Sequence, residues 1–117
     1  MDTPRQASPS VETFEIDRDH LVRRVVPRRG TPYEHRCPRS AFEEIAHAAE
    51  EMRTGITLDR IQAATGLPFT QIAVAIAFMK ERGCLAPEHG RTHAAPEGLH
   101  LDAMTEFQAL REEPRPD

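Results

Sequence analysis

The chain has 117 residues and a net charge of −4 at pH 7; 38% of its residues are hydrophobic and only 5% are aromatic. This length suits one small domain with an aliphatic core, and it does not favour an enzyme with its own catalytic pocket. No apolar run approaches the roughly 18 residues of a membrane span, no signal peptide is evident, and two cysteines are too few for a disulfide scaffold. We therefore expect a reduced, cytoplasmic protein.

The fifteen basic residues include a single lysine, Lys80, and many of the arginines lie close together near the N-terminus. Residues 18–39 hold seven arginines and two acidic residues, whereas residues 40–117 hold seven basic and thirteen acidic residues. The planar guanidinium group suits both phosphate and carboxylate partners. The basic segment is therefore predicted either to contact a nucleic-acid backbone or to pair with acidic helices, of its own chain or of a second copy.

The N-terminal third is predicted to form a disordered tail, residues 1–10, followed by a basic β-arm, residues 11–39. Alternation of apolar and polar residues predicts one strand over residues 11–16, and a second is expected over residues 21–26, where a proline ends it. A Gly-Thr-Pro turn follows, and residues 33–38 are predicted to be irregular.

A helix with clear boundary signals is predicted next. Ser40 and Glu43 have the spacing of a capping box, and Thr54-Gly55 would end the helix. The glutamates on its polar face are interpreted as solvated charge rather than as catalytic carboxylates. Its apolar side chains recur at the helical period and form one stripe, which consists of Phe42, Ile45, Ala46, Ala49 and Met52.

Two further helices are predicted, separated by a glycine. Thr57 is a candidate N-cap for the first, Gly66 would end it, and Pro68 suits the first position of the next, which would stop at Gly83. The expected inward-facing residues are Leu58, Ile61 and Ala64 in the first helix, Leu67 beneath the turn, and Ile72, Ala75, Ile76 and Met79 in the second.

A hairpin and a last helix complete the predicted elements. Residues 84–86 and 91–94 are expected to be the two strands of the hairpin. The last helix is expected to begin near Asp102, and residues 114–117 are expected to be disordered. Its apolar face would consist of Ala103, Met104, Phe107 and Leu110.

This order of elements resembles a winged helix-turn-helix domain of the bacterial transcriptional regulator type. The resemblance rests on residues 57–85, where Ala64-Thr65-Gly66-Leu67 precedes a helix that ends in Lys80-Glu81-Arg82-Gly83. It covers less than half of the chain and identifies no particular family. We therefore predict an α+β fold, mainly α, with a winged helix domain over residues 40–113.

In the proteins that the sequence resembles, the second helix of the motif enters the major groove of DNA. The resemblance implies that Thr70 and Gln71 contact bases, while Lys80 and Arg91 hold phosphates. The helix positions expected to face outward are Phe69, Thr70, Gln71, Ala73, Val74 and Ala77, and the arm would add contacts from Arg23, Arg24, Arg28 and Arg29. The implied function is DNA binding in transcriptional regulation.

An alternative hypothesis follows from the charge of this helix. No Arg or Lys lies between Arg60 and Lys80, although cations supply much of the affinity for DNA. The chain could therefore be a protein–protein interaction module with the same fold, in which Ala73, Val74 and Ala77 pack against a partner. A homodimer, through the last helix or the outer face of this one, is compatible with either function.

Histidine and cysteine residues recur without the spacing of a metal site. No Cys-x₂-Cys pair is present, and a hairpin would place its side chains on opposite faces. Phosphate-loop and nucleophile motifs are absent as well, so we expect no metal and no cofactor. The possible ligands are Cys84, His89, His93 and His100, with His35 and Cys37 in the arm.

Overall fold

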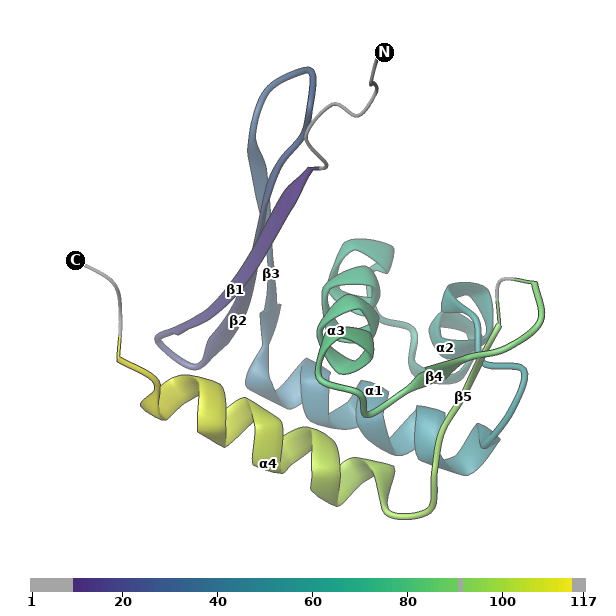
Figure 1. Cartoon of the computed structure of the whole chain (residues 1–117). Helices are drawn as coiled ribbons and strands as arrows, with labels where there is room; N and C mark the ends of the chain where they lie inside the picture. The colour runs from purple at the N-terminus through teal and green to yellow at the C-terminus, as the bar shows by residue number, and fades with distance from the viewer. Residues whose placement is uncertain (1–9, 91, 115–117) are drawn as a thin grey trace, which may run out of the picture.

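A computed structural model of the chain describes residues 10–90 and 92–114 and has an α+β fold. Two long helices lie side by side at the base of the molecule, and a sheet rises next to a third helix (Figure 1). The elements in chain order are β1 (Val11–Asp17), β2 (His20–Val26), β3 (Tyr33–Pro38), α1 (Arg39–Met52), α2 (Leu58–Thr65), α3 (Phe69–Glu81), β4 (Ala86–Pro87), β5 (His93–Ala94) and α4 (Leu99–Glu112).

The N-terminal segment forms an antiparallel three-stranded sheet in the order β1-β2-β3. Arg18 and Asp19, both with positive φ, make the tight turn between β1 and β2. The prediction that residues 33–38 are irregular is wrong, because they pair with β2 along its length, from Val25 opposite Tyr33 to His20 opposite Pro38. Only Cys37 in β3 is buried, so the segment lacks the apolar alternation that identifies a strand in a sequence.

Helix α1 begins one residue before the predicted cap. Pro38 is its N-cap and no side chain caps it, so the predicted capping box of Ser40 and Glu43 is wrong. Strand β3 leads straight into the helix, and Ser40 already lies inside the first turn. The C-cap is Arg53, with φ 68°, rather than Gly55. The predicted apolar stripe is confirmed, because four of its members are buried and Met52 packs against the core.

Helix α2 has the predicted boundary residues, whereas α3 begins one residue after Pro68, which was predicted as its first position, and its C-cap is Arg82 rather than Gly83. The Thr57 hydroxyl accepts a hydrogen bond from the Arg60 N–H at 3.1 Å, and Gly66 ends α2 in the left-handed conformation with φ 74°. Pro68 is the N-cap of α3, and all four residues predicted to form its inward stripe are buried. Ala64, however, is exposed, so its prediction as an inward-facing residue of α2 is wrong.

The hairpin after α3 is shorter than predicted. Cys84 and Leu85 are not strand residues: their N–H groups bond to the Met79 carbonyl at 2.8 and 3.2 Å and close the end of α3. Strands β4 and β5 have two residues each. Ile56, which precedes α2, forms an isolated antiparallel β-bridge with His93 of β5. The two residues exchange two backbone hydrogen bonds, at 2.9 and 3.0 Å.

Helix α4 starts at Leu99, three residues before the predicted start. Its N-terminus is capped from another helix, since the Glu50 carboxylate of α1 accepts the His100 N–H at 2.6 Å. Such a cap leaves no signal in the local sequence. The predicted apolar face is confirmed, with Ala103, Phe107 and Leu110 buried and Met104 partly buried.

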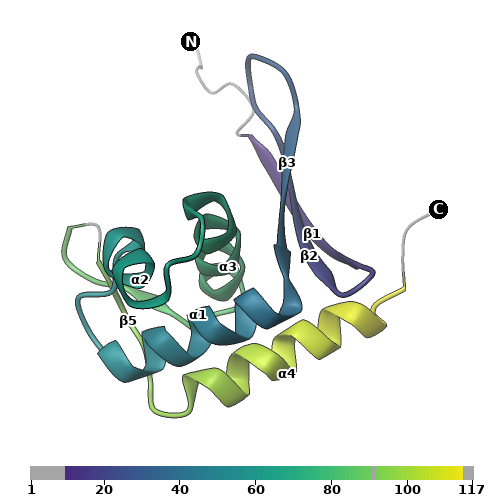
Figure 2. The ribbon, with the colours of Figure 1, turned by 180° about the vertical axis from the view of Figure 1, so that it is seen from behind.

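Phenylalanine rings connect the layers of the core. The ring of Phe78 in α3 lies 5.4 Å from that of Phe14 in β1 and 5.8 Å from that of Phe42 in α1, and Phe42 lies 5.3 Å from Phe107 in α4. Ile16 from the sheet belongs to the same buried cluster. Helix α3 is thus enclosed between α1 and α2 on one side and the sheet on the other (Figure 2).

Candidate nucleic-acid interface

The side of α3 that was predicted to face DNA is partly covered by the sheet. Val74 is fully buried in the core, so its prediction as an outward, DNA-contacting residue is wrong. Ala73 and Ala77 are half-buried. Much of the apolar surface that these residues form in the sequence is therefore used within the chain.

The N-terminal turn of α3 remains open. Phe69 is 44% exposed and Thr70 is exposed, while Gln71 is half-buried. The polar side chains that were predicted to contact bases are therefore accessible at the end of the helix rather than along its side.

The β2–β3 loop, residues 27–32, lies at the same end of the molecule as the N-terminus of α3. Both views of the ribbon show this loop and this helix end pointing away from α1 and α4 (Figures 1 and 2). Arg28 and Arg29 are exposed in the loop and form no ion pair with any described residue. They are therefore free to bind an anion.

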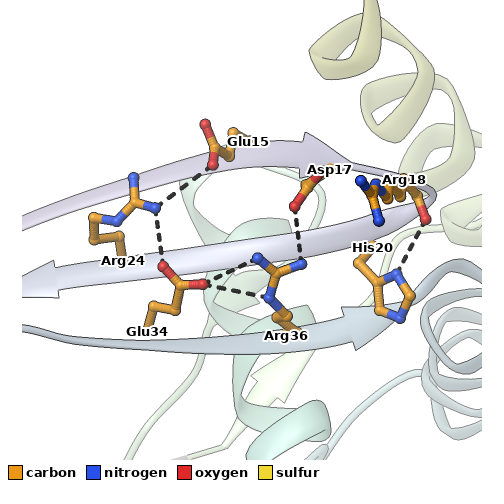
Figure 3. A network of polar contacts seen from close by, with 7 residues as sticks. All are labelled: Glu15, Asp17, Arg18, His20, Arg24, Glu34 and Arg36. Carbon is orange, nitrogen blue, oxygen red and sulfur yellow. Dashed lines mark hydrogen bonds and ion pairs between the residues drawn. The ribbon is translucent and has the colours of Figure 1, made fainter.

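Arg24, by contrast, is engaged within the sheet. Its guanidinium lies 2.9 Å from Glu34 and 3.6 Å from Glu15. Arg36 extends this network, at 3.1 Å from both Glu34 and Asp17 (Figure 3). Hydrogen bonds from Arg24 and then Arg36 lower the pKa of Glu34. Hydrogen bonds to Asp17 and then Glu34 raise the pKa of Arg36.

Arg23 is engaged on the opposite face of the sheet, where its Nε lies 2.5 Å from Glu12. The predicted pairing of arm arginines with acids is thus observed, but the carboxylates come from β1 and β3 rather than from the helices. Among the described residues one ion pair joins the arm to an acidic helix, and there the charges are reversed: Arg111 of α4 pairs with Asp19 of the β1–β2 turn.

Lys80, a further predicted phosphate contact, lies toward the other end of α3. Lys80 is exposed in the last turn of α3, about 15 Å along the helix from Thr70 at 1.5 Å per residue. It borders a shallow groove between α3 and the sheet with Glu12, Arg23 and Glu81. Arg91 lies outside the described residues.

Of the histidines and cysteines considered as possible metal ligands, only His100 belongs to a group of three close potential ligands among the described residues. Burial raises the pKa of the Cys37 thiol to about 12 and that of Cys84 to about 11, which suppresses the thiolate form that binds metals. His100 lies on α4 next to Glu43 and His47 of α1. Glu43 and His47 are four residues apart, a spacing that places them on one helix face, and this was the sequence signal for their proximity.

In the described part of the chain, no helix has both the length and the apolar character that crossing a membrane requires. No protein-family model, no curated protein and no solved structure matches the chain.

Proposed function

We propose that the chain is a DNA-binding protein of the winged helix-turn-helix type, with a role in transcriptional regulation. The order of elements supports this assignment: α1, the bridging residue Ile56, α2, a turn at Gly66, α3 and the β4–β5 hairpin follow one another as a tri-helical unit with a small sheet would.

The observation that carries the proposal is a separation of charge. Arg28 and Arg29 lie at the end of the molecule where α3 begins, and α1 and α4, with their exposed carboxylates, lie at the other end. An anionic duplex would therefore approach the N-terminus of α3 with the acidic helices directed away from it. The partial positive charge of a helix N-terminus adds to the attraction.

In this arrangement Thr70 and Gln71 contact base edges, and the β2–β3 loop holds the adjacent backbone or minor groove through Arg28 and Arg29. Lys80 provides a further, more distant phosphate contact. Few cations take part, so binding should be weak and tolerant of sequence. Three phosphate contacts predict a slope of log K against log salt of about −2.7.

The test is fluorescence anisotropy of a labelled random duplex, titrated with the full chain at several salt concentrations. We expect micromolar affinity at low salt, and we expect the double variant Arg28→Gln, Arg29→Gln to reduce the magnitude of the slope by about 2. The matched control is Arg39→Gln, Arg53→Gln, which removes the same charge from two exposed arginines of α1 and its C-cap. No binding at low salt, or equal losses in both double variants, would contradict the proposal.

A second candidate function is protein binding by the same end of the molecule. The described large hydrophobic side chains that are exposed include Val11, Val26 and Tyr33 of the sheet and Phe69 of α3. Val11 pairs directly with Val26, and both lie at the end of the sheet near the β2–β3 loop. Adjacent exposed apolar residues are typical of an interaction surface.

Sedimentation of the chain over a range of concentrations tests this candidate with a second copy as the partner. Self-association that Val26→Lys abolishes, together with an absence of DNA binding, would favour the interaction module. A monomer at all concentrations that binds DNA would favour the first proposal.

A further inference from the structure

A cluster of one carboxylate and two imidazoles joins α1 to α4, far from the β2–β3 loop. Glu43 and His47 lie one turn apart on α1, and His100 lies in the first turn of α4. One ligand atom of each residue lies within 4.8 Å of those of the other two. The imidazole rings are stacked, with centroids 3.7 Å apart and planes inclined by 14°.

We propose that Glu43, His47 and His100 bind a divalent transition-metal ion, of which Zn²⁺ is the best representative. Imidazole nitrogen and carboxylate oxygen are both zinc ligands, with bonds of about 2.0–2.2 Å. Two ligand atoms of a tetrahedral ion with such bonds lie about 3.3–3.6 Å apart. The Nε2 of His100 and the Oε2 of Glu43 are already 3.2 Å apart, so these two ligands need almost no rearrangement.

The third ligand, His47, is exposed, so its ring has room to rotate about its side-chain bonds, out of the stack with His100 and toward the ion. The backbone positions are set by two packed helices. Two nitrogen donors favour zinc, copper or nickel over the oxygen-binding ions calcium and magnesium. Three protein ligands leave one coordination position for water or for a donor from another molecule.

Glu50 is a positioning residue for this site. Its carboxylate accepts the backbone N–H of His100 at 2.6 Å and so fixes the start of α4 above α1. It lies three residues after His47, on the same face of α1. The metal site and the cap together would tie the last helix to the body of the protein, so metal binding should stabilise the fold.

The experiment uses the full chain without an affinity tag, dialysed against a chelator and titrated with zinc chloride by calorimetry at pH 7.5. We expect one ion per chain with Kd below 10 µM and a rise in Tm of at least about 5 °C at saturating zinc. Cobalt(II) in place of zinc should give the intense visible absorption of a tetrahedral site.

Two variants locate the binding. His47→Ala replaces an exposed side chain with a good helix former, so it should fold normally and weaken zinc binding at least tenfold. His89→Ala, which removes an exposed histidine outside the cluster, should bind zinc like the wild type. A Kd above 10 µM for the wild type, unchanged binding by His47→Ala, or an equal loss in His89→Ala would overturn the proposal. Circular dichroism of both variants confirms that each is folded.

Discussion

The two faces of the N-terminal sheet differ in the interactions that stabilise them. On the inner face, Phe14, Ile16, Leu21 and Cys37 pack into the core that the helices share. On the outer face, Arg24 and Arg36 form a network of ion pairs with carboxylates of β1 and β3 (Figure 3). Val22, which is paired with Glu15 and Arg36 in the sheet, is buried on this face. Because successive side chains of a strand point to opposite faces, Leu21 of β2 packs into the core whereas Arg24 of the same strand forms ion pairs on the outer face.

This contrast shows why a basic stretch of sequence need not produce a basic surface. The arginines of β2 and β3 are matched by carboxylates of β1 and by Glu34, so the sheet is largely neutral where its strands pair. Arg28 and Arg29, in the loop beyond the paired region, have no described acidic partner, and neither does Arg18 in the β1–β2 turn. The paired strands are thus a structural layer of the domain, and the loop is the segment on which the proposed function depends.

The largest expected loss of stability comes from a substitution in the core that the inner face of the sheet covers. Phe78→Ala removes a fully buried ring that contacts both Phe14 and Phe42, and it should lower the free energy of unfolding by about 3–5 kcal/mol. Phe69→Ala in the same helix removes an exposed ring and should change it by less than about 0.5 kcal/mol. Urea denaturation followed by circular dichroism measures both. A loss in Phe78→Ala as small as that expected for Phe69→Ala would contradict a core shared by the sheet and the helices.

The titration of the Cys37 thiol should have an intermediate effect on the free energy of unfolding, and this effect depends on pH. Because burial raises its pKa to about 12, the folded state keeps a proton that the unfolded chain releases near its ordinary value of 9.0. Stability should therefore fall between pH 9 and pH 12, with a contribution from this thiol of at most about 1.4 kcal/mol per pH unit. The same burial should protect the thiol from a disulfide reagent until urea unfolds the chain.

Cys37→Ala keeps the site small and apolar and removes the titration. Its free energy of unfolding should decline less steeply above pH 9 than that of the wild type. Parallel curves for the two proteins would show that the thiol does not carry the effect.

The helices were predictable because each signal is local. The stripes of α1 and α4 follow the helical period, and the side chain of Thr57 and the conformation of Gly66 act within a few residues of their own positions. The start of α4 could not be located in this way, since its cap comes from Glu50, half the chain away.

The burial of α3 also has a signal in the sequence, which is the composition of the helix rather than a boundary residue or a stripe. Residues 72–79 are apolar throughout, and a helix that is apolar all round is buried on all sides. That pattern indicates that Val74 and Phe78 need a covering layer, but it does not say which segment supplies it. The covering segments are β3 and β2, and their contacts with α3 join parts of the chain that are far apart in the sequence and leave no local pattern.

The smallest expected effect is on the outer face of the sheet. Glu34→Gln breaks its ion pairs with Arg24 and Arg36, which are solvent-exposed, so Tm at pH 7 should fall by no more than about 3 °C, and by less in 1 M salt. Because the pKa of Glu34 is lowered in the fold, its stabilising effect is present above the ordinary carboxyl pKa and is lost as pH falls through the lowered value. The wild type and the variant should therefore converge in Tm in acid.

The control is Glu44→Gln, which removes an exposed carboxylate of α1 with no described ion pair and should match the wild type throughout. A large, salt-insensitive loss in Glu34→Gln would mean that the outer face contributes as much to stability as the inner one.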